Sequence, residues 1–417
     1  MRLRTLLPIV VLLILLLHPA RARDWFESES RHFKVVYRAE HAVLVPQILD
    51  AAEKAFKPLS QLFDYTPSEK IIINTYDFSD YGKAGTTTLP QNFIRLEIAP
   101  LQLSYETMPF NGRIQWIISH ELVHVIVNDQ AGRVETFNRS LFSKVPPEKA
   151  QPLTVLYSHL TNTQRYSPRW HQESIAIFME TWLSGGFGRV LGNFDEMYYR
   201  SMVFENRDFP TPRYLEAKTS HNSFLLQTLF YLYGARFSAY LAHHYGSDKL
   251  VEWFRVRNSY EYLHFEQKFK RVFKTSLQTA WTNFIANEKA FQGSNINILK
   301  SEPLTEMYPL TDQPLGWVTK AYHEPDRNAL IFGFHRPHQL TKLVRFDLKS
   351  KTYQKIGSLP SPSMVGIAST AFDRRNRLLF YTTNNNKLFR DIHVLSTASG
   401  ENKLLFRDCR VGHITVS

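Results

Sequence analysis

The segment from Arg113 to Asn128 is the feature that most constrains the fold. Its apolar side chains fall on nearly every side of a helix, and only His120, Glu121 and His124 interrupt them in its middle. A helix that is apolar all round has to be buried, so other elements must cover it on several sides. The chain has the composition for such a core, with 43% hydrophobic and 14% aromatic residues. We therefore expect a packed globular fold that encloses this helix and its three ionisable side chains.

The segments around this helix predict a mixed α+β fold. A strand and a helix open it, two further strands should pair in the same small sheet, and the middle of the chain is helical. The expected strands are His32–Tyr37, Lys70–Tyr76 and Phe93–Ile98, and the expected helices are Val43–Asp64, Arg113–Asn128, a helix from Trp170 to the Ser184-Gly185-Gly186 break, and helices over about 222–245 and 247–293. The segment Gly82–Pro90 is rich in turn residues and predicts a loop.

Near residue 300 the sequence pattern changes from helical periodicity to short strand-like runs, and these runs repeat. Arg327–Phe332 recurs 48 residues later as Arg375–Phe380, and Arg345–Leu348 recurs in position as His393–Ser396. Each unit has room for four short strands, as one propeller blade requires. Two units cannot close a ring, so we expect an incomplete β-propeller of about two blades, with a small β-sandwich as the alternative.

The N-terminus has the pattern of an export signal. Arg2 and Arg4 precede an apolar run that ends at Leu17, and small residues follow at Ala20 and Ala22. The run is shorter than the roughly 20 residues of a membrane-spanning helix, so we expect cleavage after Ala22, with a retained anchor as the alternative. This predicts an exported protein of the periplasm or cell envelope, or a secreted one, whose mature chain has no transmembrane span.

The string His120-Glu121-Leu122-Val123-His124 is an H-E-x-x-H pattern. Its spacing brings the two imidazoles to one face of the helix, one turn apart, as two ligands of a single metal ion require. Glu121 then lies beside the metal without binding it, where it can take a proton from the attacking water. A string this short also arises by chance, so the assignment needs a third ligand.

A catalytic zinc site takes one more protein ligand and keeps one position for water. The metzincin pattern would require a glycine at position 127 and a histidine at position 130, but the chain has Val127 and Gln130. The gluzincin pattern takes a glutamate from a later helix, and Glu173 stands there in an apolar helical setting. Burying a glutamate is costly unless it is paired or bound to a metal, which favours Glu173 as the third ligand. His171 is the competing ligand, although it points away from the face of Glu173.

These strings resemble the paired signatures of the peptidase MA-like gluzincins, over roughly residues 30–295. Trp170-x-x-Glu173-Ser174-Ile175-Ala176 is similar to the second signature, except that family members usually carry glycine in place of Ser174. Pro109-x-Asn111, and Phe178–Trp182 followed by Gly185-Gly186, resemble a subgroup of exported bacterial proteins that join this peptidase to a TolB-like propeller. We accordingly divide the chain into a signal peptide (1–22), a zinc metallopeptidase domain (23–297) and truncated propeller repeats (298–417).

The resemblance also implies a donor for the tetrahedral intermediate, because gluzincins commonly supply a tyrosine or histidine from a downstream helix. Tyr231 lies in a segment that resembles this helix and is the candidate. Tyr233 is the alternative, and both residues could instead be core aromatics. Glu180 could orient a ligand imidazole from behind, and the other interpretation is a solvated or capping glutamate.

The stretch between His124 and Glu173 is longer than compact gluzincins use. It holds basic residues beside apolar ones, namely Arg133, Arg139, Lys144, Lys149, Phe137, Leu141 and Phe142. Three interpretations remain open: a lid over the cleft, a surface-docking element, and a plain helical excursion packed on the domain.

Two classes of function fit these observations. The first is an exported zinc metallopeptidase with one zinc ion per chain, Glu121 as general base, and a peptide or protein substrate. The second is a non-catalytic envelope scaffold that keeps the fold and binds a protein partner through the propeller. The intact set of ligands and base favours the enzyme. The formal charge of +12 could suit an anionic surface or be a solvated basic face, and no motif indicates nucleic acid as a partner.

Overall fold

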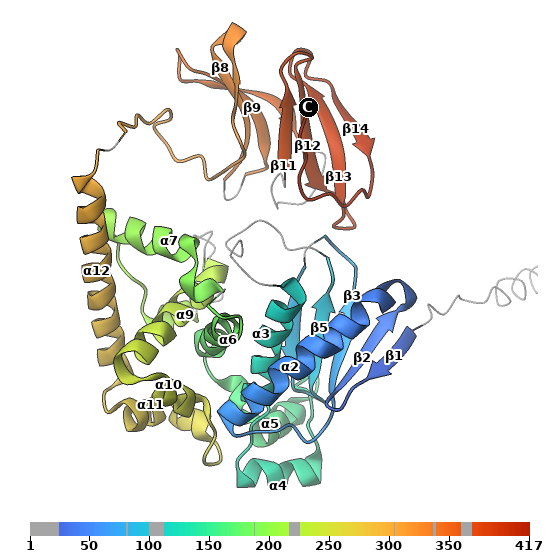
Figure 1. Cartoon of the computed structure of the whole chain (residues 1–417), viewed down its shortest axis with the longest axis vertical. Helices are drawn as coiled ribbons and strands as arrows, with labels where there is room; N and C mark the ends of the chain where they lie inside the picture. Colours follow the sequence, from blue (N-terminus) through green and yellow to red (C-terminus); the bar gives the residue numbers. More distant parts are fainter. Residues whose placement is uncertain are drawn as a thin grey trace, which may run out of the picture.

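The computed structural model describes residues 25–80, 82–99, 112–186, 188–216, 226–303, 305–336, 339–359 and 369–417. The expected signal at residues 1–22 and the Pro109–Asn111 string lie outside these residues. Figure 1 shows one sheet with helices against it, a helical middle, and two further sheets near the C-terminus. Within the described residues, none of the three sheets closes on itself. The mixed α+β class is therefore confirmed, whereas the propeller stays a prediction.

Alternating apolar residues build a five-stranded mixed sheet. The strands lie in the order β1-β2-β3-β5-β4; β2, β3 and β5 run parallel, and β1 and β4 are antiparallel to their neighbours. Their bounds are β1 (Trp25–Glu29), β2 (Phe33–Arg38), β3 (Ile71–Tyr76), β4 (Ala84–Thr87) and β5 (Phe93–Glu97). Buried residues alternate along much of the central strands, at Phe33 and Val35, at Ile71 and Ile73, and at Ile94 and Leu96.

Strand β4 forms one edge of this sheet, with Thr86 opposite Ile94. The expectation of a loop throughout Gly82–Pro90 is therefore wrong for Ala84–Thr87. The strand has only four residues, none of them fully buried, so it lacks the apolar alternation by which strands are recognised. Its position matters because it borders helix α3.

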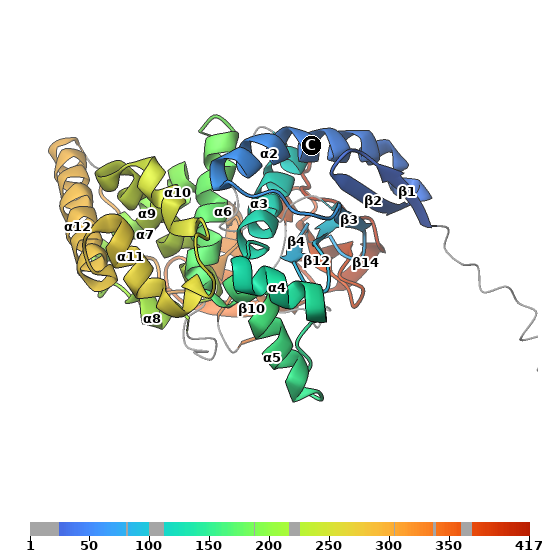
Figure 2. The same cartoon turned by 90° about the horizontal axis from the view of Figure 1, so that it is seen from below.

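Helices α2 (Val45–Phe63) and α3 (Arg113–Asn128) pack together against the sheet (Figures 1 and 2). In α2, buried residues recur at helical spacing, among them Ile48, Ala52 and Leu59. In α3, 11 of 16 residues are buried, including His120 and Glu121. The expectation that this helix lies inside the protein is confirmed, with the bounds that the sequence indicated.

Most of the remaining helices lie beyond α6, which packs against α3 (Figure 1). Helix α6 packs between α3 and α9. The bounds are α4 (Arg133–Phe142), α5 (Pro152–Thr161), α6 (Arg169–Leu183), α7 (Asn193–Phe204), α8 (Pro212–Leu215), α9 (Leu226–Tyr245), α10 (Ser247–Phe254), α11 (Phe265–Phe273) and α12 (Leu277–Ser301). The helical stretch expected over 247–293 is thus divided into three helices.

Two antiparallel sheets follow. The first has the order β10-β9-β8-β6 with β7 also paired to β8, and the second has the order β11-β12-β13-β14. The bounds are β6 (Trp317–Val318), β7 (Tyr322–Glu324), β8 (Ala329–His335), β9 (Lys342–Asp347), β10 (Tyr353–Ser358), β11 (Ser369–Asp373), β12 (Leu378–Asn384), β13 (Arg390–Ser396) and β14 (Asn402–Phe406). The repeated strings fall on equivalent strands, β8 with β12 and β9 with β13. Ile331 and Leu343 pack against Leu379 and Leu395 between the sheets, which suits both a pair of blades and a sandwich.

The second of these sheets contacts the loop between β3 and β4. Arg410 forms ion pairs with Asp77 and Asp80, and the Arg390 backbone N–H donates to Asp80 Oδ2 at 2.6 Å. The Asp80 N–H donates in turn to the Leu388 carbonyl at 3.0 Å.

Among the described residues, no helix combines the length and the apolar character needed to cross a membrane.

Candidate metal centre

Three side chains from two helices meet inside the protein. His120 and His124 lie one turn apart on α3, and Glu173 comes from the first half of α6, which packs against α3. His124 Nε2 is 3.1 Å from His120 Nε2 and 3.2 Å from Glu173 Oε2, and His120 Nε2 is 3.4 Å from the same oxygen. Within the described residues, they are the group of histidine and acidic side chains whose atoms converge closely enough to hold a metal ion.

These separations fit a tetrahedral ion. Zinc bonds of about 2.0–2.1 Å to nitrogen and oxygen would place neighbouring ligand atoms about 3.3–3.4 Å apart. The three measured distances, 3.1, 3.2 and 3.4 Å, lie close to that value. Two imidazoles and one carboxylate also leave a fourth position for water, as catalytic zinc sites do. His120, His124 and Glu173 are therefore suited to hold zinc.

A buried ion pair stands behind His120. Glu180 Oε2 lies 2.8 Å from His120 Nδ1, and Arg189 Nε and Nη2 each donate to Glu180 at 2.8 Å. Burial raises the pKa of Glu180, but the charge of Arg189 and the hydrogen bonds from Arg189 and His120 hold it at about 2. Arg189 Nη2 also lies 3.0 Å from His120 Nδ1, and an ionised Glu180 favours the tautomer that carries its proton on Nδ1 and leaves Nε2 facing the centre. The interpretation of Glu180 as a solvated or capping glutamate is therefore wrong, because its side chain is buried between His120 and Arg189.

The carboxylates at this centre favour binding of a cation. Burial lowers the pKa of His120, but hydrogen bonds to Glu173 and Glu180 outweigh this and raise it to about 9. Burial raises the pKa of Glu173, but the charges and hydrogen bonds of His124 and His120 hold it well below its ordinary value. The Glu173 carboxylate is thus negative and is stabilised by positive charge. A bound metal ion would provide that charge in place of the proton on the His120 imidazole.

Glu121 follows His120 on α3, and its carboxylate contacts the sheet. The Thr86 hydroxyl donates to Glu121 Oε2 at 2.6 Å and lies 3.1 Å from the Glu121 carbonyl oxygen. Thr86 belongs to the edge strand β4, so the sheet fixes this carboxylate from outside the helix. Glu121 is 5% exposed, and its position beside the ligands matches that of a proton acceptor.

Tyr231 and Tyr233 have different surroundings on α9. The Arg189 guanidinium lies 5.4 Å from the centre of the Tyr231 ring, and burial together with the charge of Glu173 raises the pKa of Tyr231 well above its ordinary value. Tyr233 is fully buried, and its hydroxyl is 3.3 Å from that of Tyr198. Tyr231 therefore lies near the metal centre, and Tyr233 belongs to the aromatic core.

His171 takes no part in this group. Its ring stacks on Phe254 with centroids 4.0 Å apart and meets Trp253 and Phe265 edge-on. Burial among these rings lowers its pKa well below the ordinary value. Among the described residues, neither ring nitrogen has a hydrogen-bond partner. The competing assignment of His171 as the third ligand does not agree with this placement.

Sequence patterns do not indicate two residues of the site. Thr86 lies in a short edge strand, in a segment whose sequence predicts a loop, and Arg189 lies in a short 3₁₀ turn (Arg189–Leu191) after the Gly185-Gly186 break. Neither position belongs to a motif. A signal existed only for Arg189, since a buried Glu180 requires a cation nearby.

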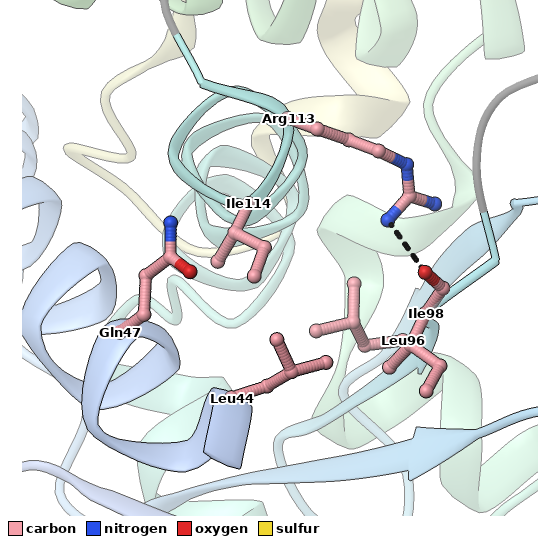
Figure 3. Close-up of a pocket in the computed structure, with 6 residues that line it drawn as sticks. All are labelled: Leu44, Gln47, Leu96, Ile98, Arg113 and Ile114. Carbon is pink, nitrogen blue, oxygen red and sulfur yellow. Dashed lines mark hydrogen bonds between the residues drawn. The ribbon is translucent and has the colours of Figure 1, made fainter. Parts of the chain in front are cut away.

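A pocket of about 320 Å³ lies at the N-terminal end of α3 and contains none of these site residues. Figure 3 shows its lining of Leu44, Gln47, Leu96, Ile98, Arg113 and Ile114. The Arg113 guanidinium donates to the Glu97 carbonyl at 2.9 Å and to the Ile98 carbonyl at 3.5 Å. The pocket is mostly apolar, and its one charged lining residue is bound to backbone.

The chain resembles solved structures at low sequence identity. No family model and no curated protein matches the sequence. Among solved structures, the chain is similar to native yeast LTA4 hydrolase, with 12% identity and a TM-score of 0.35 over 62% of this chain and 39% of that one. It is also similar to an aminopeptidase N family protein from Idiomarina loihiensis, with 11% identity and a TM-score of 0.32 over 80% of this chain and 66% of that one. The chain thus spans less than two thirds of both proteins, and likeness at these TM-scores carries no argument about activity.

Proposed function

We propose that this chain is an exported zinc metallopeptidase of the gluzincin type that hydrolyses peptide bonds. The observation that supports it is the convergence of His120 Nε2, His124 Nε2 and Glu173 Oε2 at tetrahedral separations, with Glu121 next to His120 on the same helix. A structural zinc site would use a fourth protein ligand, and the described residues bring none to this group. Zinc held there would supply Lewis-acid chemistry and lower the pKa of a water to about 7.

The residues of the chain would divide the remaining work. Thr86 occupies Glu121 Oε2, so we assign Oε1 as the atom that accepts the proton of the attacking water. The water oxygen bonds to the peptide carbonyl carbon, the C–N bond breaks, and Glu121 passes the proton to the leaving amine nitrogen. We assign Tyr231 as the donor to the oxyanion, because its phenol lies close enough to Glu173 to feel the charge of that carboxylate and its ring lies 5.4 Å from the Arg189 guanidinium. Arg189 and Glu180 would hold the tautomer of His120.

The test uses residues 23–417 and a mixed peptide library, with zinc measured in the same preparation. We expect cleavage by the wild-type chain and a loss of about 10²–10⁴-fold in rate for Glu121→Gln, with zinc retained. The exposed Glu205→Gln should cleave normally. Undiminished cleavage by Glu121→Gln would show that the assigned base is wrong. Zinc binding without cleavage of any peptide would favour the non-catalytic scaffold instead.

A further inference from the structure

The insert between the two ligand-bearing helices α3 and α6 carries an exposed apolar surface. We call residues 133–161, with α4 and α5, the apolar hairpin. Seven large hydrophobic side chains on it are between 40% and 64% exposed: Val134, Phe137, Leu141, Phe142, Leu153, Val155 and Leu156. Figure 1 places α4 at the end of the molecule away from the C-terminal sheets, and Figure 2 shows α5 projecting from the body.

Polar contacts on the inner side hold the two helices together. Asn138 Nδ2 donates to the Leu160 carbonyl at 3.0 Å, and Arg139 donates to the Thr161 carbonyl and to Asn162 Oδ1, each at 2.6 Å. The ring of Phe142 stacks on that of Tyr157 with centroids 5.0 Å apart. The hairpin is thus held together by polar contacts on its inner side, while seven large apolar side chains remain exposed.

Charges are scarce on the outer side. The exposed charged residues of the hairpin are Arg133, Glu148 and Lys149. Helix α5, with the sequence PLTVLYSHLT, contains no lysine, arginine, aspartate or glutamate. Ordinary water-facing surface carries roughly 25–35% charged residues, so the hairpin does not have the composition of a surface that stays in water.

Helix α5 presents its exposed apolar side chains as one face. Successive residues of a helix turn by about 100°, so Leu153 and Leu156 lie about 60° apart and Val155 lies about 100° from Leu156. A helix that lies in the interfacial layer of a bilayer buries a single apolar face of this kind. Each helix has 10 residues, too short to span a bilayer but suited to its interfacial layer. Among the exposed charged residues of the hairpin, Arg133 and Lys149 outnumber Glu148. This positive excess suits anionic headgroups.

We propose that the apolar hairpin docks this protein on the surface of an anionic lipid bilayer by inserting its apolar side chains among the headgroups and upper acyl chains. The hairpin connects α3 to α6, and Asn162 at its base donates to Thr88, which follows β4. Docking would therefore hold the candidate metal centre close to the membrane surface. The proposal stands on exposure, composition and shape, and it holds whether or not the centre is catalytic.

The test is flotation of residues 23–417 with vesicles of phosphatidylcholine and with vesicles that also contain phosphatidylglycerol. Omitting residues 1–22 matters, because their apolar run would itself bind lipid. We expect the wild-type chain to float with the anionic vesicles, and Leu141→Ser/Leu153→Ser to partition at least about tenfold less. The matched control Met307→Ser/Leu310→Ser replaces exposed apolar residues outside the hairpin, which are 88% and 46% exposed, and should float like the wild type.

Zinc content and circular dichroism of each variant would establish that its fold is intact. The proposal is overturned if the wild-type chain floats with neither vesicle, or if the control loses binding as strongly as the hairpin variant. A dimer that dissociates in Leu141→Ser/Leu153→Ser without any vesicle binding, measured by sedimentation equilibrium, would instead assign the hairpin to contact between two copies of this chain. Binding that persists in 0.5 M salt would support insertion over charge attraction alone.

Discussion

At the scale of single residues, the centre is organised by a chain of charges that runs outward from the ligands. Glu173 faces His120 and His124, Glu180 holds the far nitrogen of His120, and Arg189 holds Glu180. Arg189 also lies about as far from the Trp116 ring as from the Tyr231 ring, at 5.3 and 5.4 Å. It therefore connects the ligand side of the site with the proposed oxyanion donor.

Replacing Arg189 should weaken metal binding, although this side chain does not reach the ion. Arg189→Met leaves Glu180 buried beside His120 without its cation, which disturbs the orientation of the imidazole. We expect the zinc affinity to fall about 10–100-fold, measured by competition with a chelator. Arg189→Lys should recover part of it, and Arg257→Met, at an exposed ion pair, should change nothing. An unchanged affinity in Arg189→Met would mean that Glu180 alone positions His120.

Removing the Thr86 hydroxyl should affect the reaction rather than the metal. In Thr86→Val the Glu121 carboxylate loses a hydrogen bond, and bonds to charged groups contribute about 1.5–3 kcal/mol. We expect kcat to fall about 10–100-fold with KM and zinc content little changed, and Thr86→Ser to restore most of the rate. A change in KM alone would assign Thr86 to substrate binding.

The sequence could predict those site residues that local spacing defines. His120, Glu121 and His124 follow from one helical turn, and Glu173 follows from the cost of a carboxylate in an apolar helix. Thr86 could not be predicted, because its role depends on a β4–α3 contact between residues 35 positions apart. The choice between the alternatives for Glu180 also required the position of Arg189.

At the scale of elements, the site depends on close packing of α6 against α9. A Cβ atom added at Gly234 of α9 would lie 2.4 Å from the Trp170 carbonyl oxygen and 3.1 Å from Ser174 Cβ. Backbone cannot swing aside as a side chain can, so the two helices would have to separate. This contact sets the distance between Tyr231 on one helix and Glu173 on the other.

Gly234→Ala should therefore destabilise the protein even though alanine favours helices. Overpacking costs about 1–3 kcal/mol and exceeds the gain in helix propensity of about 1 kcal/mol. We expect a lower midpoint of thermal unfolding and a lower kcat. Gly293→Ala in α12 is the matched control, because a Cβ atom there meets nothing within 4 Å, and it should stabilise slightly. If both variants behave alike, the close approach of α6 and α9 is not a constraint.

The sequence predicted long periodic elements well and short or irregular ones poorly. Helix α3 has the expected bounds because its apolar pattern is continuous. The stretch 247–293 is broken after Phe254, where Arg255 is extended, and at Lys274, which adopts a left-handed conformation with φ of 60°. A left-handed helix end is usually marked by glycine or asparagine, so Lys274 gave no signal. The repeats near the C-terminus revealed equivalent strands but not how the sheets would pack.

At the scale of the whole molecule, the C-terminal sheets are attached by charges to the sheet that carries β4. The hydrogen bonds and charge of Arg410 hold the pKa of Asp77 below its ordinary value, although burial opposes this. A carboxylate whose pKa is lowered by folding stabilises the folded state above its unfolded pKa. That contribution is lost as the pH falls through the lower, folded pKa.

Asp77→Asn should consequently destabilise the attachment near neutral pH but not in acid. We expect a loss of about 1–2 kcal/mol at pH 6, and a difference from the wild type that shrinks as the pH falls below about 4. Thermal unfolding of both chains at several pH values measures it. Asp326→Asn, at an ion pair where Asp326 is 80% exposed, should have little effect at any pH. A difference that persists in strong acid would contradict the role of this ion pair.

The central claim is that His120, His124 and Glu173 bind one zinc ion, and the most direct measurement is X-ray absorption at the zinc edge together with zinc content in residues 23–417. We predict one zinc per chain with only nitrogen and oxygen ligands, at about 2.0–2.2 Å, and loss of the metal in His124→Ala and Glu173→Ala. The only cysteine is Cys409, in the C-terminal part, so sulfur in the coordination sphere would contradict the assignment. A chain that binds no zinc, or one that retains it after both substitutions, would contradict it equally.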